Sequence, residues 1–105
     1  MQRQLRFTDE AVGQLKALAA DQAKKGLQKQ VLKTLGLLET NPRNPGLSTH
    51  EYESLRGVDG ERVWEAYVQN QAPSAYRVFF HYGPDEVLGK KRIPILTIVA
   101  ITQHP

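Results

Sequence analysis

The fold of this chain can be read from one stretch, Ala75-Tyr76-Arg77-Val78-Phe79-Phe80-His81-Tyr82. Successive side chains of a β-strand point to opposite faces, so four of these residues share one face: Tyr76, Val78, Phe80 and Tyr82. Because that face is wholly apolar or aromatic, it is predicted to be buried. Arg77, Phe79 and His81 are then predicted to stand on the opposite, open face of a sheet.

Two more strand-like runs lie on either side of this stretch, at residues 62–68 and 95–101. The loops between the three runs are too short for helical crossovers, so the three strands are predicted to pair antiparallel. Residues 83–92 are predicted to form a longer loop that carries the cluster Lys90-Lys91-Arg92. Residues 47–56 are ambiguous.

The chain before these runs predicts a short strand and a helix. Residues 2–7 alternate imperfectly between apolar and polar side chains, which indicates the strand. Thr8 is a good N-cap for a helix over about residues 9–24, where apolar residues recur at helical spacing. Gly26 is predicted to end this helix.

A second helix is predicted from Leu27 up to Asn41-Pro42, because proline cannot continue a helix. One strand, a helical hairpin and three strands predict an α+β fold of order β-α-α-β-β-β, with the hairpin on one face of a small antiparallel sheet. The length fits a single domain over residues 1–105. Shared periodicity predicts a core of Phe7, Leu15, Leu18, Val31, Leu35, Leu38, Trp64, Val78, Phe80, Ile98 and Ala100.

Composition limits the classes of function. The chain has 14 Lys and Arg against 11 Asp and Glu, a net charge of +3, and the surplus lies in residues 1–40. This balance permits an RNA or acidic-protein partner without demanding one. With no cysteine and no histidine pair at metal-ligand spacing, neither a metal nor another cofactor is expected. No apolar run is long enough to span a membrane, so a cytoplasmic protein is expected.

Four side chains are candidates for binding or chemistry. Arg77 offers a planar fork of donors that suits a phosphate or a carboxylate, although a solvated arginine on a sheet gives the same spacing. His104, just beyond the last predicted strand, is of a residue type suited to proton transfer. His50 and Glu51 follow the Pro-Gly turn, and either can accept a proton or serve as a polar loop residue.

Several motifs, taken in order, resemble the RelE/ParE superfamily of bacterial toxins. They are the turn Asn41-Pro42-Arg43-Asn44-Pro45-Gly46-Leu47, the tripeptide Leu55-Arg56-Gly57, and the strands Val63-Trp64-Glu65-Ala66-Tyr67-Val68 and Tyr76-Arg77-Val78-Phe79-Phe80. A last apolar strand then ends near His104. The resemblance covers nearly the whole chain and implies the toxin component of a type II toxin–antitoxin pair.

Two activities are implied by this resemblance. One is ribosome-dependent, metal-independent cleavage of mRNA, in which a ribose 2′-hydroxyl attacks the adjacent phosphate. By resemblance Arg77 is then the phosphate clamp, His104 the acid, and His50 or Glu51 the base. The other activity, as in the ParE branch, is binding to DNA gyrase without catalysis. Further candidates for phosphate or RNA contact are Arg56, Arg62, Lys90, Lys91 and Arg92.

The resemblance also implies partners: an acidic antitoxin, together with the ribosome and mRNA or with DNA gyrase. An inactive relative that only pairs with a partner protein is a third possibility. Ribonuclease members commonly carry Lys or Arg on the strand at residues 63–68, where this chain has Glu65 and Tyr67. A carboxylate there could pair with Arg77 and make it a structural residue.

Overall fold

The computed structural model describes residues 2–69 and 75–103. Its elements in chain order are β1 (Gln4–Phe7), α1 (Asp9–Ala20), η1 (Gln22–Lys24), α2 (Lys25–Thr40), η2 (Pro45–Leu47), β2 (His50–Arg56), β3 (Arg62–Tyr67), β4 (Tyr76–Tyr82), β5 (Glu86–Leu88), β6 (Lys91–Ile93) and β7 (Ile95–Gln103). The predicted α+β class and the order of the major elements are confirmed. The ambiguous residues 47–56 contain the last residue of η2 and the whole of β2.

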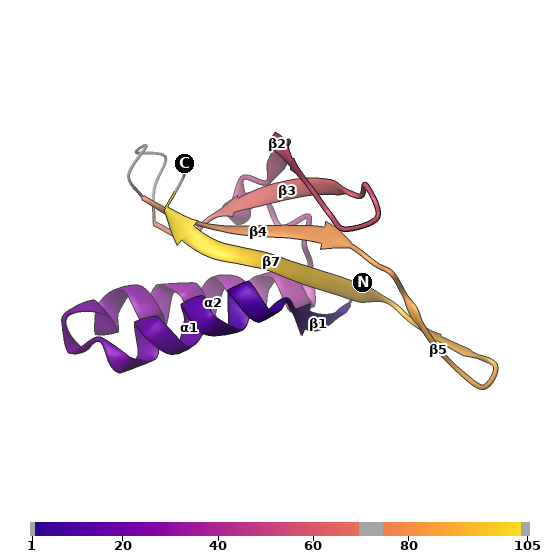
Figure 1. The fold of residues 1–105 in the computed structure, drawn as a ribbon, viewed down its shortest axis with the longest axis horizontal. Helices are drawn as coiled ribbons and strands as arrows, with labels where there is room; N and C mark the ends of the chain where they lie inside the picture. Colours follow the sequence, from indigo (N-terminus) through magenta and orange to yellow (C-terminus); the bar gives the residue numbers. More distant parts are fainter. Residues whose placement is uncertain (1, 70–74, 104–105) are drawn as a thin grey trace.

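The main sheet has five strands in the order β1-β7-β4-β3-β2, and the α1–α2 hairpin covers one of its faces (Figure 1). The pairs β3–β4 and β4–β7 are antiparallel, as predicted. The edge strand β1 pairs parallel with β7, so the sheet is mixed and not wholly antiparallel. The long segment between β1 and β2, which holds both helices, leaves β1 free to pair with the last strand of the chain.

The helix boundaries differ from the prediction at one point. Thr8 is the N-cap of α1, and its Oγ1 accepts a hydrogen bond from the backbone N–H of Ala11 at 3.1 Å, as predicted. The predicted end near Lys24 is wrong, because Asp21 takes an extended conformation and caps the short η1 turn instead. Gly26 therefore lies in the first turn of α2 and does not end α1.

The core between the helices and the sheet, called here the inner core, matches most of the predicted residues. The predicted residues that are buried within it are Leu18, Val31, Leu35, Leu38, Val78, Phe80 and Ile98. Phe7, Leu15 and Trp64 pack against it and are partly buried. Ala100 is buried too, but in a second cluster on the opposite face, so its predicted position is wrong.

A β-bulge in β7 explains the error at Ala100. Phe80 pairs with Ile98 and Phe79 pairs with Ala100, so β7 has one extra residue, Val99, at this point. The extra residue reverses the alternation of side chains along the rest of the strand. Ile98 and Ile101 consequently both face the helices, although they are three residues apart.

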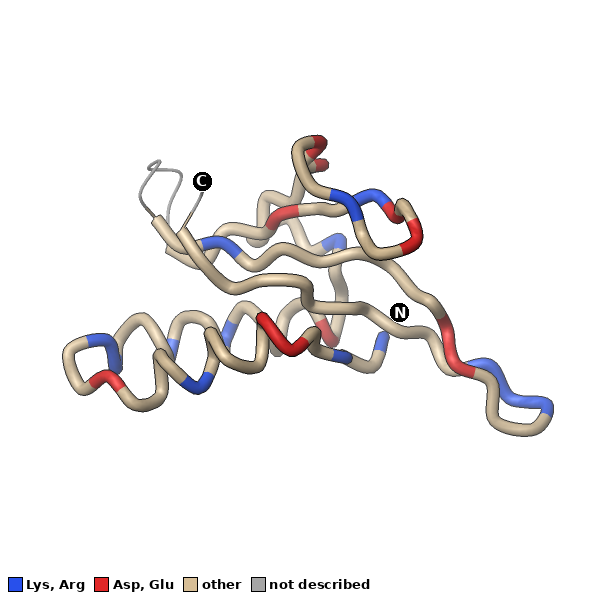
Figure 2. Tube along the Cα trace, viewed as in Figure 1, with Lys and Arg blue, Asp and Glu red and all other residues tan. Residues whose placement is uncertain are grey.

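Residues 83–92 are not simply the predicted loop, since β5 and β6 pair as an antiparallel ribbon that extends away from the main body (Figure 1). Val87 and Leu88 on this ribbon are 65% and 66% exposed. Basic residues are spread over the helices, the β2–β3 turn and this ribbon (Figure 2). Among the described residues no helix is long and apolar enough to cross a membrane.

Candidate functional site

Arg77 lies near the start of β4, on the sheet face opposite the helices. It pairs with Tyr67 of β3 and with Thr102 of β7. The predicted face is therefore right, but the prediction that this face is open is wrong, since Arg77 is 2% exposed and His81 is 5% exposed. Strand β2 curls over this face and contributes Tyr52 and Leu55 to a second hydrophobic cluster.

This cluster, called here the outer apolar cluster, is built on Val63, Phe79 and Ala100, with Tyr52, Leu55 and Val99 packed against it. The ring centroids of Tyr52 and Phe79 are 5.1 Å apart. Apolar packing therefore occupies the middle of the outer face. The polar residues gather beside it, where β4 begins.

The guanidinium of Arg77 is held by contacts close to it. Its Nη1 donates hydrogen bonds to the carbonyl oxygens of Ala75 at 3.1 Å and Tyr76 at 3.2 Å. Its Cζ lies 4.2 Å from the centroid of the Tyr67 ring, in a cation–π arrangement. The charge is thus fixed in one place beneath an aromatic ring.

His50, at the start of β2, belongs to the same group of side chains. It pairs across the strands with Glu65, and its Nε2 forms an ion pair with the Glu65 carboxylate, which is 2% exposed. The His50 ring centroid is 5.4 Å from that of Tyr67. His50, Glu65, Tyr67 and Arg77 form what we call the polar cluster, contributed by β2, β3 and β4.

The His50 ring is oriented by both of its nitrogens. Nε2 faces the Glu65 carboxylate, and Nδ1 lies 3.2 Å from the carbonyl oxygen of Ser48. Both partners are acceptors, so both ring nitrogens donate when the imidazole is protonated; in the neutral Nε2–H form, Nε2–H donates to Glu65 and the Nδ1 lone pair is left without a donor partner in the Ser48 carbonyl. The imidazole side chain is 44% exposed, while the carboxylate that orients it is buried. This is the arrangement of an accessible proton-transfer group held by a buried acid.

Glu51, the other candidate base, lies on the opposite face. It pairs with Trp64, and its Oε2 is 3.5 Å from Arg56 Nη1 and 3.9 Å from Arg62 Nε. Arg56 and Arg62 also pair directly with each other across β2 and β3. The structure thus brings three of the predicted site residues together here, away from Arg77.

Lys90, Lys91 and Arg92 lie at the other end of the molecule, on the β5–β6 ribbon. This ribbon precedes β7 at Ile95, whereas Arg77 pairs with Thr102 near the end of β7. Seven residues of strand separate these positions, or roughly 23 Å at 3.3 Å per residue. His104 lies outside the described residues, so its predicted place beside Arg77 is not tested.

Two members of the polar cluster were not among the sequence-predicted site residues. The sequence offers Glu65 as a possible partner of Arg77, and the structure shows an ion pair between Glu65 and His50. Tyr67 was seen only as a departure from the resemblance. The strand alternation places both on the face of Arg77, but their contact with His50 depends on the β2–β3 register.

No group of three or more His, Cys, Asp or Glu side chains that could hold a metal ion is found in residues 2–69 and 75–103. The polar cluster contains one carboxylate, one imidazole, one phenol and one guanidinium. Side chains of these types are able to transfer protons and to stabilise an anion.

Comparison with solved structures identifies a similar fold in the crystal structure of YafQ from E. coli strain BL21(DE3), at a TM-score of 0.58 and 17% sequence identity. The match covers 97% of this chain and 93% of the YafQ chain. YafQ is a RelE-family toxin, so the fold implied by the RelE/ParE resemblance is confirmed. No family model and no curated protein match the chain.

Proposed function

We propose that this chain is the toxin of a type II toxin–antitoxin pair and that it cleaves mRNA on the ribosome without a metal. The observation that carries the proposal is the polar cluster, in which an oriented imidazole and a buried guanidinium from separate strands share one end of the outer face. The fold shared with YafQ supports the same reading.

In the proposed reaction, His50 acts as the base. The step starts from the neutral imidazole, whose Nε2–H donates to Glu65; Nδ1 then takes the proton from the ribose 2′-hydroxyl once that hydroxyl replaces the Ser48 carbonyl. The 2′-oxygen then bonds to phosphorus and the bond from phosphorus to the 5′-oxygen breaks. The products are a 2′,3′-cyclic phosphate and a free 5′-hydroxyl, whose proton comes from His104 as the proposed acid.

Arg77 stabilises the charge that develops on the phosphate in this scheme. A guanidinium suits this role because its planar fork matches two phosphate oxygens. Since Arg77 is 2% exposed and lies against the Tyr67 ring, its contact with the phosphate requires that ring to move aside. Tyr67 is thereby proposed to gate the clamp. Arg56 and Arg62 are proposed to contact RNA from the other face.

A non-catalytic binder, as in the gyrase-binding branch or an inactive relative, is the alternative. The burial of Arg77 favours it, because the guanidinium is already held by backbone carbonyls and a ring. In either case the expected partner is an acidic antitoxin and the expected location is the cytoplasm. Co-expression with the neighbouring reading frame tests the antitoxin: purification of this chain as a lone monomer would contradict it.

The experiment that tests cleavage is induced expression followed by primer extension on cellular mRNA. Cuts at fixed codon positions that depend on translation support the ribonuclease. His50→Ala should remove the cuts, while Lys33→Ala, on the exposed side of α2, should leave them unchanged. Intact mRNA with a wild-type protein that still arrests growth would favour the binder.

A further inference from the structure

We propose that a second site, remote from the polar cluster, binds the phosphate of a nucleotide or RNA strand. It is a pocket of about 350 Å³ lined by Arg3, Asn41, Pro42, Arg43 and Tyr82. Two of these side chains are guanidinium groups and none is acidic. Arg77 is near the first residue of β4 and Tyr82 is the last, so the strand separates the two sites by roughly 17 Å at 3.4 Å per residue.

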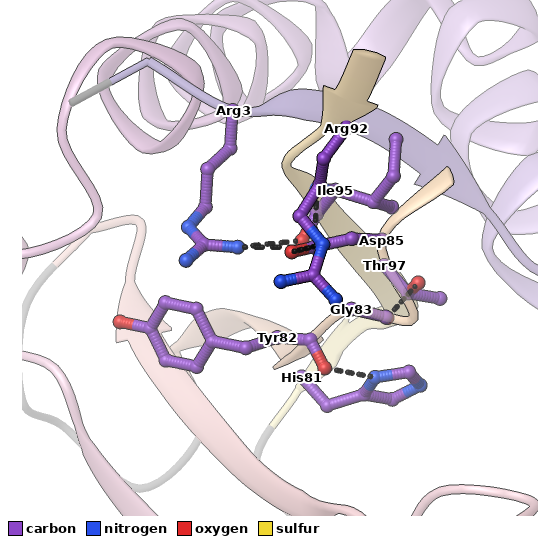
Figure 3. A network of polar contacts seen from close by, with 8 residues as sticks. All are labelled: Arg3, His81, Tyr82, Gly83, Asp85, Arg92, Ile95 and Thr97. Atoms are coloured by element: carbon purple, nitrogen blue, oxygen red, sulfur yellow. Dashed lines mark hydrogen bonds and ion pairs between the residues drawn. The ribbon is translucent and has the colours of Figure 1, made fainter. Parts of the chain in front are cut away.

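Arg3 is fixed at one wall of the pocket. Its Nη1 donates a hydrogen bond to the carbonyl oxygen of Ile95 at 3.1 Å and lies 3.6 Å from Asp85 Oδ1 (Figure 3). Its Cζ is 4.9 Å from the centroid of the Tyr82 ring. These contacts hold the guanidinium in place, which reduces the side-chain entropy that Arg3 would lose when an anion binds.

The positive charge at this wall exceeds the negative charge. Asp85 is itself oriented, since its Oδ1 accepts a hydrogen bond from the Ile95 N–H at 3.0 Å. Arg92 also points toward it, with Nε 4.0 Å from Asp85 Oδ2, so one carboxylate lies between two guanidinium groups (Figure 3). A neighbouring hollow is lined by Glu39, but the pocket between Arg3 and Arg43 has no carboxylate.

Arg43 also lines the pocket and lies on the turn that follows α2. Its backbone N–H donates to Asn41 Oδ1 at 3.0 Å, and the Asn44 N–H donates to the Asn41 carbonyl oxygen at 3.0 Å. Strand β1 is tied to the same region, because the Arg3 N–H donates to the Glu39 carbonyl oxygen at 3.0 Å. The backbones of both arginines are therefore fixed relative to the end of α2.

Phosphate is the ligand class that this chemistry fits. Guanidinium groups bind phosphate oxygens through paired N–H donors, a geometry that lysine does not provide. The Arg3 guanidinium stacked near the Tyr82 ring adds a flat surface of the kind on which nucleobases stack. These features favour a nucleotide over the side-chain carboxylate of a protein. The proposal goes beyond the proposed cleavage, because binding here needs no residue of the polar cluster.

The test is a binding titration of the full chain with a fluorescent 2′-O-methyl uridine hexanucleotide, which has no 2′-hydroxyl and cannot be cleaved. Arg43→Gln should weaken binding at least about tenfold, the effect of losing a hydrogen bond to a charged group. It should also lower the slope of log affinity against log salt by about 0.7. Lys33→Gln makes the same change of charge on an exposed part of α2 and should alter neither quantity.

A second variant, Arg3→Gln, should weaken binding as well, and its thermal melting shows whether the Ile95 and Asp85 contacts were also needed for folding. Equal affinities for Arg43→Gln and Lys33→Gln would overturn the proposal, as would no binding by the wild type at low salt. Displacement of the RNA by an equal charge of polyglutamate, dependent on Arg43, would assign the pocket to an acidic protein.

Competition experiments with inorganic phosphate and with UMP distinguish two kinds of site. Equal competition by both indicates a site for phosphate alone, and stronger competition by UMP indicates a site that also binds the nucleoside. Since the probe is not a substrate, failure of the cleavage proposal leaves this result unaffected.

Discussion

The two faces of the main sheet are both covered, but by different means. On the inner face, two helices pack apolar side chains such as Leu35 and Leu38 against Phe80. On the outer face, a single curled strand supplies a smaller cover over Val63 and Phe79, with ionisable groups buried beside it. Helices bring whole apolar stripes, whereas a strand offers every second side chain.

The different covers of the two sheet faces suit different purposes, since the inner face holds apolar packing and the outer face also holds ionisable groups. Glu65, Arg77 and His81 are buried on the outer face, whereas on the described helices only Thr34 is a buried polar residue. A buried ionisable group costs free energy unless it is paired and hydrogen-bonded. We therefore expect substitutions on the inner face to change unfolding and those at the polar cluster to change activity.

The largest expected effect is on catalysis, at His50. If the proposed reaction is correct, His50→Ala should lower the rate of mRNA cleavage by about 10²–10⁴, the usual range for general acid–base catalysis. Glu51→Ala should change the rate far less, because Glu51 faces away from Arg77 and contacts Arg56 and Arg62. Cleavage rates per folded molecule on isolated ribosomes check this. A greater loss for Glu51→Ala would reverse the assignment of the base.

The next effect is on stability and compares the two faces with one substitution. Leu35→Ala should lower the free energy of unfolding by about 2–5 kcal/mol, since Leu35 lies in the inner core. Leu55→Ala, in the partly buried cover of the outer face, should cost less than about 2 kcal/mol. Urea denaturation of both variants measures the difference. Equal losses would show that the two covers stabilise the fold to the same degree.

Arg77→Ala decides whether the polar cluster acts in catalysis or in structure. A phosphate clamp predicts a fall in cleavage rate of roughly 10²–10³, the effect of losing one preorganised donor. Arg77→Lys should restore little, because a point charge lacks the planar fork. The melting temperature of the same variants is the necessary second measurement. Full cleavage by a folded Arg77→Ala protein would exclude the clamp.

The smallest expected effect concerns an ion pair that lies on neither face of the main sheet and joins Arg6 of β1 to Glu86 of β5. Arg6 donates to Glu86 through Nε at 2.8 Å and Nη2 at 2.7 Å, and these hydrogen bonds lower the pKa of the Glu86 carboxyl below its usual value. A lowered carboxyl pKa contributes stability above the pKa of the unfolded chain, and this is lost as pH falls through the folded value.

The wild type should therefore be slightly more stable than Glu86→Gln near neutral pH, and the melting temperatures of the two proteins should converge in acid. Thermal melts of both proteins over an acidic pH series measure this. A difference in melting temperature that persists at the lowest pH would mean that the contribution of Glu86 to stability does not depend on its charge.

Much of the fold followed from the sequence because its signals are local. The alternation in residues 76–82 gives β4 and its two faces, and Thr8 marks the start of α1 through a hydrogen bond three residues away. The β5–β6 ribbon was missed because its strands are three residues each, too short for an alternating pattern.

The candidate site depended on pairing between strands. The sequence alone placed Arg77 on the face away from the helices and proposed His50 and Glu51 as equal candidates for the base. The tertiary structure placed His50 beside Glu65 and Tyr67, and put Glu51 on the opposite face. In the tertiary structure Arg77 is also buried, and Ala100 lies in the outer apolar cluster and not in the inner core. The physical reason is that register, bulges and the curl of β2 are set by the packing of distant segments, whereas side-chain alternation is set by the backbone of each strand itself.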